Sequence, residues 1–571
     1  MRYLFLCAIG PVQDFIATAR RSRDLWYGSW MLSELSKIAA KTVGEKYGLD
    51  SLIFPAPRDI KKLDENNEAS IANKVVAVID TSPEKMAQQI NEAVTERLNA
   101  LRDEAYSQVR GAYDRSLAER QVNDLIELYW VAVEYPDEKK YKETRNKAEA
   151  LLAVRKNTRN FKQFKGEPKP KSSLDGARES VIPEEAYPRK WEDENTQSKK
   201  IKSLYDCYHA RRSERLSGVD LIKRLGGQNL EPKFHSTSHM AALPFLKMVE
   251  DKKTGSSGAM LAEVRALYKE FELDIPDVAS LLYASRVSDW IQEGTRQEEL
   301  QTELDKILTK YAGKKRPSPY YALMMADGDG MGKTIDALKN DIKHRTFSQV
   351  LGAFSDHVRE TVPHFEGVPI YAGGDDILAY LPLHQALPCA KQLENDFQKE
   401  MERFKYNDGN KVICPTLSAG IIIAHHLTPL SDVLELTRKA EKEAKKVPGK
   451  NALVITVSKR SGSPRTIKGK WGSLDKRLDE MIKFSNQDAI SKGTAYELRE
   501  LSRTLSSSKE LKDALIQESL RIVKRKRESG SNKKIPENVI NAFEYWLEKE
   551  QVPVNELSRE LIVSEMFVST Q

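Results

Sequence analysis

The sequence predicts an α+β protein of several domains, in which two α/β units are combined with helical segments. The chain has 571 residues, which suggests about three to five domains. Strand-like apolar runs between residues 320 and 383 stop at glycines and acids, and the N-terminal third has a similar alternation without those acids. Residues after about 461 carry apolar side chains at helical spacing. We therefore expect a duplicated α/β unit, with one copy stripped of its acidic groups.

The order of these patterns along the chain gives the expected domain boundaries. The segment that follows the first α/β unit is polar, proline-bearing and irregular, and a helical pattern comes after it. We expect a first α/β domain at 1–164, an irregular linker at 165–235, a helical domain at 236–316, a second α/β domain at 317–460 and a C-terminal helical domain at 461–571.

Composition predicts a soluble protein. The charged fraction is 31%, the mean hydropathy is −0.56, and no apolar run approaches the roughly 18 residues of a membrane span. The apolar start of the chain ends at Gly10 and Pro11 without a cleavage-site pattern. Four scattered cysteines form no disulfide or metal pattern. We expect a cytoplasmic protein with no membrane partner.

One stretch is strongly basic. Residues 139–171 hold twelve lysines and arginines against three glutamates, with aromatic residues interleaved. Positive charge beside aromatic rings suits a nucleic-acid backbone, although a solvated arm has the same composition. We predict that RNA contacts this stretch through Arg155, Lys156, Arg159, Lys162 and Lys165.

The acids of the second α/β unit follow two strand-like runs. Residues 320–326 form an apolar run that ends at Asp327 and Asp329. Residues 368–381 predict a hairpin with Asp375 and Asp376 at its tip. Gly-Asp pairs are also common in ordinary turns, so either motif alone could be a turn. Together they predict one site, because the intervening segment has the apolar face of a covering helix.

These carboxylates predict a metal-dependent transfer of nucleotides. Acids at one strand edge repel one another unless a cation lies among them, and hard oxygen ligands suit Mg²⁺ or Mn²⁺. Two such ions can activate an attacking hydroxyl and neutralise a leaving pyrophosphate. We assign the catalytic and metal-binding roles to Asp327, Asp375 and Asp376, with Asp329 assisting. The glycines that leave room for phosphates are Gly328, Gly373 and Gly374.

Four motifs together resemble the large subunit of type III-B CRISPR effector complexes, the Cmr kind. They are residues 10–16 (GPVQDFI) with 23–30 (RDLWYGSW), residues 234–241 (FHSTSHMA), residues 327–333 (DGDGMGK) and residues 373–376 (GGDD). The resemblance covers about residues 1–460 in domain order. It implies two ferredoxin-like polymerase/cyclase palm domains, of which the second is catalytic.

The resemblance also implies partners, a product and further site residues. Members of this family assemble with a guide RNA and other subunits, and on binding target RNA they convert ATP into cyclic oligoadenylate messengers. By similarity to GGDEF-type cyclases, Lys445 and Lys450 would hold triphosphate oxygens. The first palm would hold the second nucleotide near Gly28 and Ser29.

The sequence departs from the family in two respects. Many members begin with an HD nuclease domain, whereas this chain begins at the palm and has no His-Asp dipeptide, so we expect no such activity. The family often has a four-cysteine zinc site, and the corresponding positions here are Ser172, Asp175, Ser217 and Asp220. Serine is a poor zinc ligand and two carboxylates do not make a thiolate site, so we expect no structural zinc.

Two alternatives to the messenger synthase stay open. The same metal chemistry could join AMP to another small molecule, such as S-adenosylmethionine, because the palm motifs do not specify the acceptor. The chain could instead be a catalytically silent scaffold that binds RNA, although its intact acids argue against this.

Overall fold

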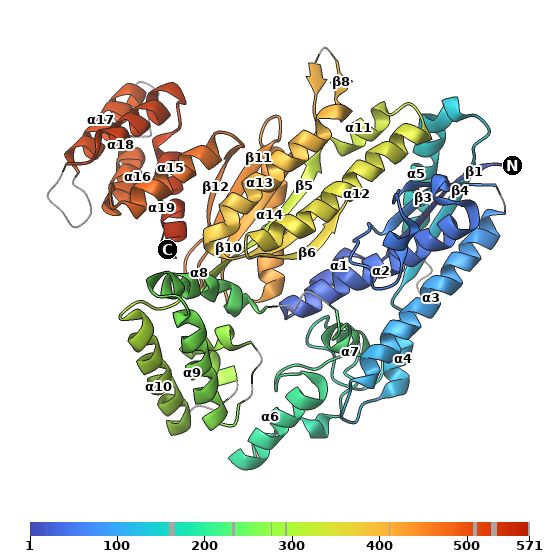
Figure 1. Ribbon diagram of the computed structural model, residues 1–571, viewed down its shortest axis with the longest axis horizontal. Coiled ribbons are helices and arrows are strands. Elements are labelled where there is room, and N and C mark those ends of the chain that lie inside the picture. Colours follow the sequence, from blue (N-terminus) through green and yellow to red (C-terminus); the bar gives the residue numbers. More distant parts are fainter. Residues whose placement is uncertain are drawn as a thin grey trace.

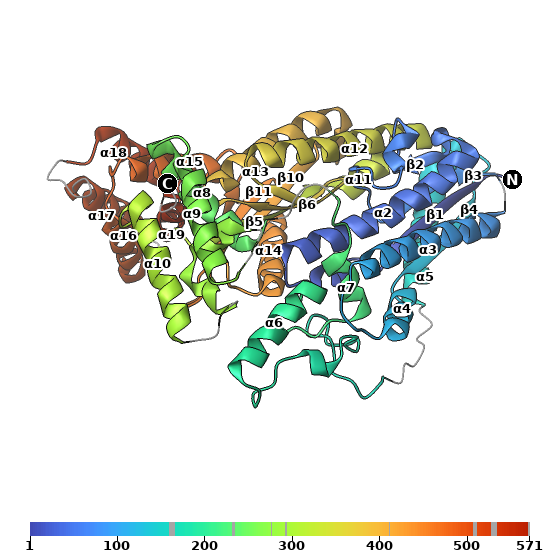
Figure 2. The same cartoon turned by 60° about the horizontal axis from the view of Figure 1, so that its bottom comes forward.

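The computed structural model describes residues 1–568, apart from residues 81, 159–165, 231–234, 274, 276, 290, 292–293, 410, 506–510 and 527–533. Its two α/β domains lie side by side, with helical domains at their flanks (Figures 1 and 2). No helix in the described part of the chain is long and apolar enough to cross a bilayer.

The first α/β domain contains an antiparallel sheet with the strand order β2-β3-β1-β4. Its alternate residues feed two cores, because successive side chains on a strand point to opposite faces. Phe5, Cys7 and Ile9 of β1 pack with α2 and α3, whereas Leu4 and Leu6 pack beneath α5. The elements are β1 (Tyr3–Gly10), α1 (Gln13–Ala17), α2 (Ser22–Tyr47), β2 (Leu52–Phe54), β3 (Lys74–Ile79), α3 (Pro83–Ser107), α4 (Arg115–Asn123), β4 (Glu127–Glu134) and α5 (Tyr141–Asn157).

The second α/β domain contains a larger sheet with the order β12-β11-β10-β5-β7-β6. Helices α12 and α13 cover one face and α14 covers the other. The elements are β5 (Tyr320–Asp329), α11 (Met331–Ala337), α12 (Asp341–His364), β6 (Val368–Gly373), β7 (Asp376–Leu381), α13 (Leu383–Met401), β8 (Tyr406–Asp408), β9 (Lys411–Ile413), β10 (Thr416–His425), α14 (Leu430–Lys446), β11 (Ala452–Ser458) and β12 (Arg465–Lys470).

The two domains share one topology. In chain order, β5, α12, β6, β7, α13 and β10 repeat the strand–helix–strand–strand–helix–strand succession of β1, α2, β2, β3, α3 and β4. The spatial orders β10-β5-β7-β6 and β4-β1-β3-β2 also correspond. This is the ferredoxin-like arrangement, and it confirms the predicted duplication.

The remaining segments are mainly helical. The segment expected to be an irregular linker contains two helices, and the second sheet continues beyond residue 460 through β12. The elements are α6 (Glu194–Tyr208), α7 (Gly218–Leu225), α8 (Thr237–Lys252), α9 (Ser256–Glu270), α10 (Thr295–Ala312), α15 (Leu474–Asn486), α16 (Gly493–Leu505), α17 (Lys512–Arg525), α18 (Glu537–Glu544) and α19 (Val554–Val568).

Helices α2 and α12 join the two α/β domains. Helix α2 packs against β6, and α12 packs against β2 (Figure 2). At the same interface the Tyr141 hydroxyl lies 2.6 Å from Nδ1 of His344, and Arg345 donates a 3.1 Å hydrogen bond to the carbonyl of Leu52. The first domain therefore forms one wall beside the hairpin that carries the acids.

Candidate active site

Strand pairing brings the two acidic motifs together. β5 pairs antiparallel with β7, and Ala326 is opposite Ile377 in the register. Asp327 and Asp376 are the next residues of these two strands toward the hairpin tip. A side chain at Gly328 would come within 2.8 Å of an Asp375 carboxylate oxygen, so the last residues of β5 lie against the hairpin tip. The predicted convergence of the two motifs is therefore present in the fold.

The hairpin tip has a turn that requires glycine. Gly373 pairs with Asp376, which leaves Gly374 and Asp375 as a two-residue loop. Gly374 has φ +72°, the positive value that the first loop position of a type II′ turn needs. Ser355 of α12 accepts a 2.8 Å hydrogen bond from the Gly374 amide and donates a 3.1 Å bond to its carbonyl. Ser355, which the sequence did not predict, thus fixes the tip to the covering helix.

Gly373 is also confined by its surroundings. A side chain there would come within 2.3 Å of the Tyr371 hydroxyl, a residue of the same strand. The glycines of the hairpin therefore do two things: Gly374 forms the turn, and Gly373 leaves space for the tyrosine beside the acids.

Helix α14 supplies a lysine and a further acid to the site. Lys445 forms an ion pair with Asp327 and lies 2.9 Å from Oε1 of Glu441. Glu441 was not predicted. Helix α14 can approach the sheet here because Gly420 of β10 has no side chain. A Cβ atom at Gly420 would come within 2.4 Å of the Glu441 amide nitrogen. The sequence predicted Lys445 as a triphosphate ligand, and here its ammonium group neutralises Asp327.

Asp329 is a hydrogen-bonded strut at the end of β5. It is 4% exposed, and its Oδ2 accepts hydrogen bonds from Thr416 (2.9 Å), Ser418 (2.7 Å) and the Asn451 amide (3.0 Å). Its Oδ1 is buried and has no hydrogen-bond partner among the described residues. Asp329 therefore ties β5 to β10 and to the loop before β11, with one oxygen uncommitted.

The carboxylates at the hairpin tip are crowded. Removal from water raises the pKa of Asp375 to about 7, and repulsion by Asp376 adds to the rise. Removal from water also raises the pKa of Asp376 to about 6. The pKa of Glu441 is raised by burial and then by Asp376. Near neutral pH Asp375 is therefore only partly ionised, and a cation bound there would displace its proton.

The acids fit Mg²⁺ or Mn²⁺ in their donor chemistry, because every ligand is a carboxylate oxygen. The acids are farther apart than the ligands of a compact ion site. Among the described residues, the only three ligand side chains whose donor atoms lie within 4.8 Å of one another are those of His235, His239 and Asp277. Lys445 supplies the positive charge at Asp327 in this arrangement.

Two further lysines border the site. Lys450 is exposed in the loop before β11, where it has φ +50°. The ammonium group of Lys470 in β12 contacts the carbonyl oxygen of Lys450. Burial lowers the pKa of Lys470, and Asp329 partly offsets this effect. Lys470 was not predicted, because the pairing of β12 with β11 brings it to this loop.

Two cavities flank the hairpin on the side of the first domain. A cavity of about 710 Å³ lies between α2, α8 and β6, and it reaches Ala372; its walls include Trp26, Trp30 and Tyr371. A smaller cavity of about 180 Å³ reaches Gly374. Both give access to the hairpin from outside the second sheet.

The two residues of the first domain that were predicted to bind nucleotide, Gly28 and Ser29, have different surroundings. Ser29 lines the larger cavity. Gly28 instead faces the protein interior, where a side chain would lie 3.5 Å from the Phe15 ring and 3.3 Å from the aliphatic stem of Lys223. Gly28 therefore allows close packing of α2 against Phe15 and Lys223, and its assignment to the nucleotide stays a prediction.

The start of α8 presents two histidines to the larger cavity. His235 and His239 stack with their ring centroids 3.7 Å apart. Nδ1 of His239 lies 2.6 Å from the carboxylate of Asp277, which also accepts a 3.1 Å hydrogen bond from the Ser236 amide. These side chains form the group of three ligand residues noted above. They belong to the FHSTSHMA motif and its surroundings and were not predicted as site residues.

The predicted RNA contacts are only partly within the described residues. Arg155 and Lys156 lie in the last turn of α5, where both are exposed. Arg159, Lys162 and Lys165 lie outside the described residues. Arg155 and Lys156 therefore lie on the helix that packs against the Leu4 and Leu6 face of the first sheet.

Two family models match the α/β domains. One, described as Cas10/Cmr2, second palm domain, matches residues 320–454, which include all the predicted acids. The other, described as CRISPR-associated protein Cmr2, N-terminal, matches residues 4–105. A curated relative, the CRISPR system Cmr subunit Cmr2 of Pyrococcus furiosus, is 28% identical, and the match covers 80% of this chain. This chain spans 61% of the length of that relative.

Solved structures share the fold. The apo state of a type III-B Cmr-beta complex contains a chain with a TM-score of 0.64 and 15% identity, and the match covers 96% of this chain and 81% of that one. Cmr-beta bound to cognate target RNA gives a TM-score of 0.68 and 15% identity, with coverage of 99% and 83%. At this identity the likeness concerns the fold.

Proposed function

The chain is a large subunit of the Cas10/Cmr2 type, as in type III-B CRISPR systems, and from this premise we propose that it is a metal-dependent nucleotidyltransferase. The observation that carries the proposal is the contact between Gly328 and Asp375, through which the end of β5 meets the hairpin tip. Acids from two distant segments then lie beside one another, next to lysines that suit polyphosphate.

In the proposed reaction a 3′-hydroxyl forms a bond to the α-phosphorus of ATP, and the bond from that phosphorus to pyrophosphate breaks. Asp327, Asp375 and Asp376 would hold Mg²⁺ or Mn²⁺, which when bound activates the hydroxyl and neutralises the leaving pyrophosphate. Lys445 would exchange Asp327 for a phosphate oxygen. Lys450 and Lys470 stand beside the same loop, where they can bind the outer phosphates.

Asp329 has a supporting role in this proposal. Its three hydrogen bonds keep the end of β5 aligned with β10 and with the Asn451 loop. A carboxylate already engaged in this way orients the neighbouring groups, and its free Oδ1 is the one oxygen left for an ion or a water.

The second nucleotide would bind between the two palm domains. The cavity of about 710 Å³ is within the usual size of small-molecule sites, and its aromatic and polar walls suit a base and a ribose. Ser29 and Trp30 come from the first palm, and Tyr371 comes from the hairpin strand. Joining two such nucleotides repeatedly, with a final ring closure, gives a cyclic oligoadenylate, which is the product we propose.

The proposal includes a guide RNA, a target RNA and other subunits of a type III-B complex. A solved complex with this fold is named as bound to cognate target RNA. Arg155 and Lys156 are exposed on α5 and are candidates for backbone contacts with RNA.

The test uses the assembled complex with labelled ATP, Mg²⁺ and target RNA. Asp376→Asn keeps the shape of the side chain and removes its charge, so product formation should fall about 100-fold or more. Asp408→Asn is the matched control, because Asp408 lies in the separate β8–β9 hairpin and pairs with Lys333. Assembly should survive both changes, and unchanged turnover by Asp376→Asn would reject the proposal.

Mass spectrometry of the product separates the alternatives. A mass that corresponds to linked adenylates with no free end identifies cyclic oligoadenylate. AMP attached to another molecule, such as S-adenosylmethionine, would keep the metal chemistry and change the acceptor. An assembled wild-type complex that makes no product with Mg²⁺ or Mn²⁺ would leave the scaffold role.

A further inference from the structure

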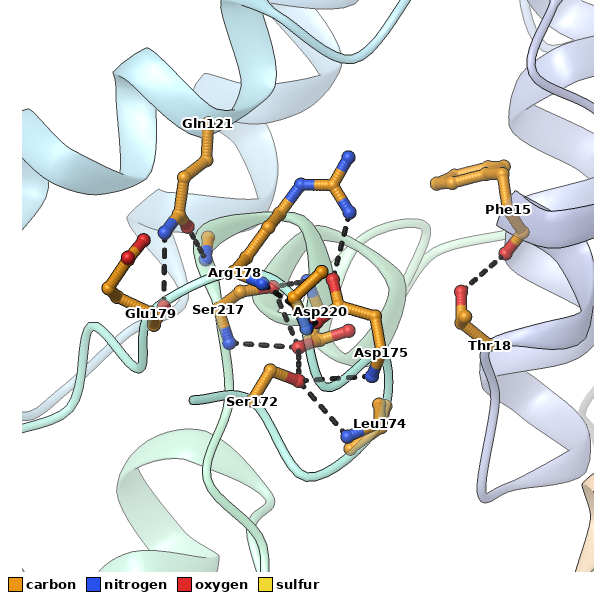
Figure 3. Close-up of polar contacts among 12 residues, drawn as sticks. Phe15, Thr18, Gln121, Ser172, Leu174, Asp175, Arg178, Glu179, Ser217 and Asp220 are labelled. Carbon is orange, nitrogen blue, oxygen red and sulfur yellow. Dashed lines mark hydrogen bonds and ion pairs between the residues drawn. The ribbon is translucent and has the colours of Figure 1, made fainter. Parts of the chain in front are cut away.

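Two segments between the first palm and α8 are bound to each other by a compact polar cluster (Figure 3). We call residues 171–180 and 214–225 the knuckle. Its backbones are joined by a 2.9 Å hydrogen bond from the Ser173 amide to the Arg215 carbonyl. Lys171 and Glu179 form a β-bridge and an ion pair within the first segment. The knuckle is therefore an ordered unit within the expected linker.

The carboxylate of Asp220 is the cross-link of the knuckle. It is 2% exposed, and its Oδ2 accepts a 2.7 Å hydrogen bond from the Ser172 hydroxyl of the other segment. The same oxygen accepts bonds from the Ser217 amide (2.8 Å) and hydroxyl (2.7 Å). Ser172 also accepts a 3.0 Å bond from the Leu174 amide. Three donors thus satisfy one buried oxygen and join both segments (Figure 3).

Asp175 completes the cluster from within its own turn. Its Oδ1 accepts hydrogen bonds from the Ala177 amide (2.9 Å) and the Arg178 amide (3.0 Å). Its Oδ2 accepts a 2.8 Å bond from the Arg178 guanidinium. The carboxylate is therefore committed to the turn and to a cation.

These four side chains do not fit zinc, although their positions resemble those of a four-cysteine site. Hydroxyl groups are poor zinc ligands, and a structural zinc site is normally closed by thiolates and imidazoles. Both carboxylates already accept hydrogen bonds, and the Arg178 guanidinium lies against Asp175. The hydrogen bonds and the guanidinium charge supply the cohesion that an ion would otherwise supply.

The knuckle is attached to α4 of the first palm. Gly218 starts α7, and a side chain there would come within 2.6 Å of Ala118. Gln121 accepts a 2.8 Å hydrogen bond from the Gly218 amide and donates a 3.0 Å bond to the Glu179 carbonyl. One glutamine therefore forms hydrogen bonds with both segments of the knuckle (Figure 3).

The residues that follow Asp220 on α7 reach the start of α2. Lys223 donates to the carbonyls of Phe15 and Thr18, the second at 2.9 Å, and its stem packs against Gly28. Arg224 binds Asp24 with two hydrogen bonds of 2.8 and 2.9 Å. The buried cations of α7 thus hold the segment from which α2 begins.

We propose that the knuckle is a metal-independent structural site, in which the Asp220 carboxylate replaces an ion and keeps α7 in position to fix residues 15–28 of the first palm. The proposal does not depend on nucleotidyl transfer. Every contact that it uses lies within the knuckle, α4 and residues 15–28.

The test measures metal content, stability and local exchange in the full chain. Purified wild type should hold less than about 0.1 equivalent of zinc by mass spectrometry, and a strong chelator should leave its melting temperature unchanged. Asp220→Asn should lower the first thermal transition by about 2–4 °C, because the amide cannot satisfy three donors. Asp206→Asn, an exposed acid on α6, is the control and should change nothing.

Hydrogen exchange tests the coupling to the first palm. In Asp220→Asn, amide protection should fall in residues 171–180 and also in residues 10–28. Unchanged protection in residues 10–28 would overturn the coupling, and stoichiometric zinc that leaves on Asp220→Asn would overturn the metal-independent assignment.

A variant designed to bind metal gives a second test of the knuckle's geometry. The quadruple change S172C, D175C, S217C and D220C converts the cluster to thiolates, so it should bind about one equivalent of Co²⁺ with the absorption of a tetrahedral thiolate site. Failure of a folded quadruple variant to bind Co²⁺ would contradict the convergence of these four positions.

Discussion

Single side chains determine how the acid cluster responds to pH. Burial and repulsion by Asp376 raise the pKa of Asp375, and Lys445 forms an ion pair with Asp327. The two acidic motifs stand out in the sequence because each adjoins a short apolar strand, and the pairing of β5 with β7 explains why they lie close together. Ser355, Glu441 and Lys470 could not be found in this way, since each reaches the site only through packing of a distant element.

The contribution of Asp375 to the stability of the metal-free protein should fall as pH rises from about 4 to about 7. The pKa of Asp375 is raised from 3.8 to about 7 in the folded state, so the folded protein binds more protons than the unfolded chain in this window. Asp375→Asn removes that titration. In EDTA, the variant should melt a few degrees above wild type at pH 8 and show no such advantage at pH 4.

Thermal melts at several pH values check this expectation. Addition of Mg²⁺ at pH 8 should raise the melting temperature of wild type more than that of Asp375→Asn, because the ion needs the deprotonated carboxylate. Equal melting temperatures at pH 8 in EDTA would contradict the raised pKa.

Helix α14 shows what element packing adds to the site. It lies on the second sheet at Gly420, and from there it carries Glu441 and Lys445 to the acids. The apolar runs within residues 320–326 and 368–381 predicted β5, β6 and β7, since such a pattern is a local property of the sequence. It did not predict β12, whose polar sequence RTIKGK becomes a strand through its pairing with β11.

Replacing Gly420 should therefore impair both stability and activity. A methyl group in Gly420→Ala would come within 2.4 Å of the Glu441 amide, and the resulting shift of α14 should cost about 1–3 kcal/mol. Product formation should fall with it, because Lys445 moves with the helix.

The matched control is Gly352→Ala in α12. Nothing lies within 4 Å of a side chain at that position, so the variant should gain about 0.5–1 kcal/mol from helix propensity. Urea unfolding measures both free energies of unfolding. If the Gly420→Ala protein is as stable and active as wild type, a methyl group at this position does not displace α14.

The whole molecule is a pair of related domains with different roles. The shared strand order was predicted as an architectural duplication, and the helices α6 and α7 within the expected linker were not. Their amphipathic faces are short, and the knuckle is held by polar contacts between segments far apart in sequence. The first palm shares the strand order of the second palm and contributes walls to the cavities beside the hairpin.

Filling those cavities should block the reaction without unfolding the protein. Ser70 lines both cavities, so Ser70→Trp places a large ring next to the hairpin from the first palm. Product formation by the assembled complex should fall about 10-fold or more. Ser107→Trp, at the exposed end of α3, is the control. Wild-type turnover by Ser70→Trp would show that substrate does not use this space.

The contact between α2 and β6 has a consequence for solubility. β6 is the last strand on its side of the second sheet, and such a strand offers unpaired amides and carbonyls to any passing strand. Because α2 lies along it, that border is covered from within the same chain. The domain duplication thus also guards against strand-to-strand aggregation at the border nearest the acids.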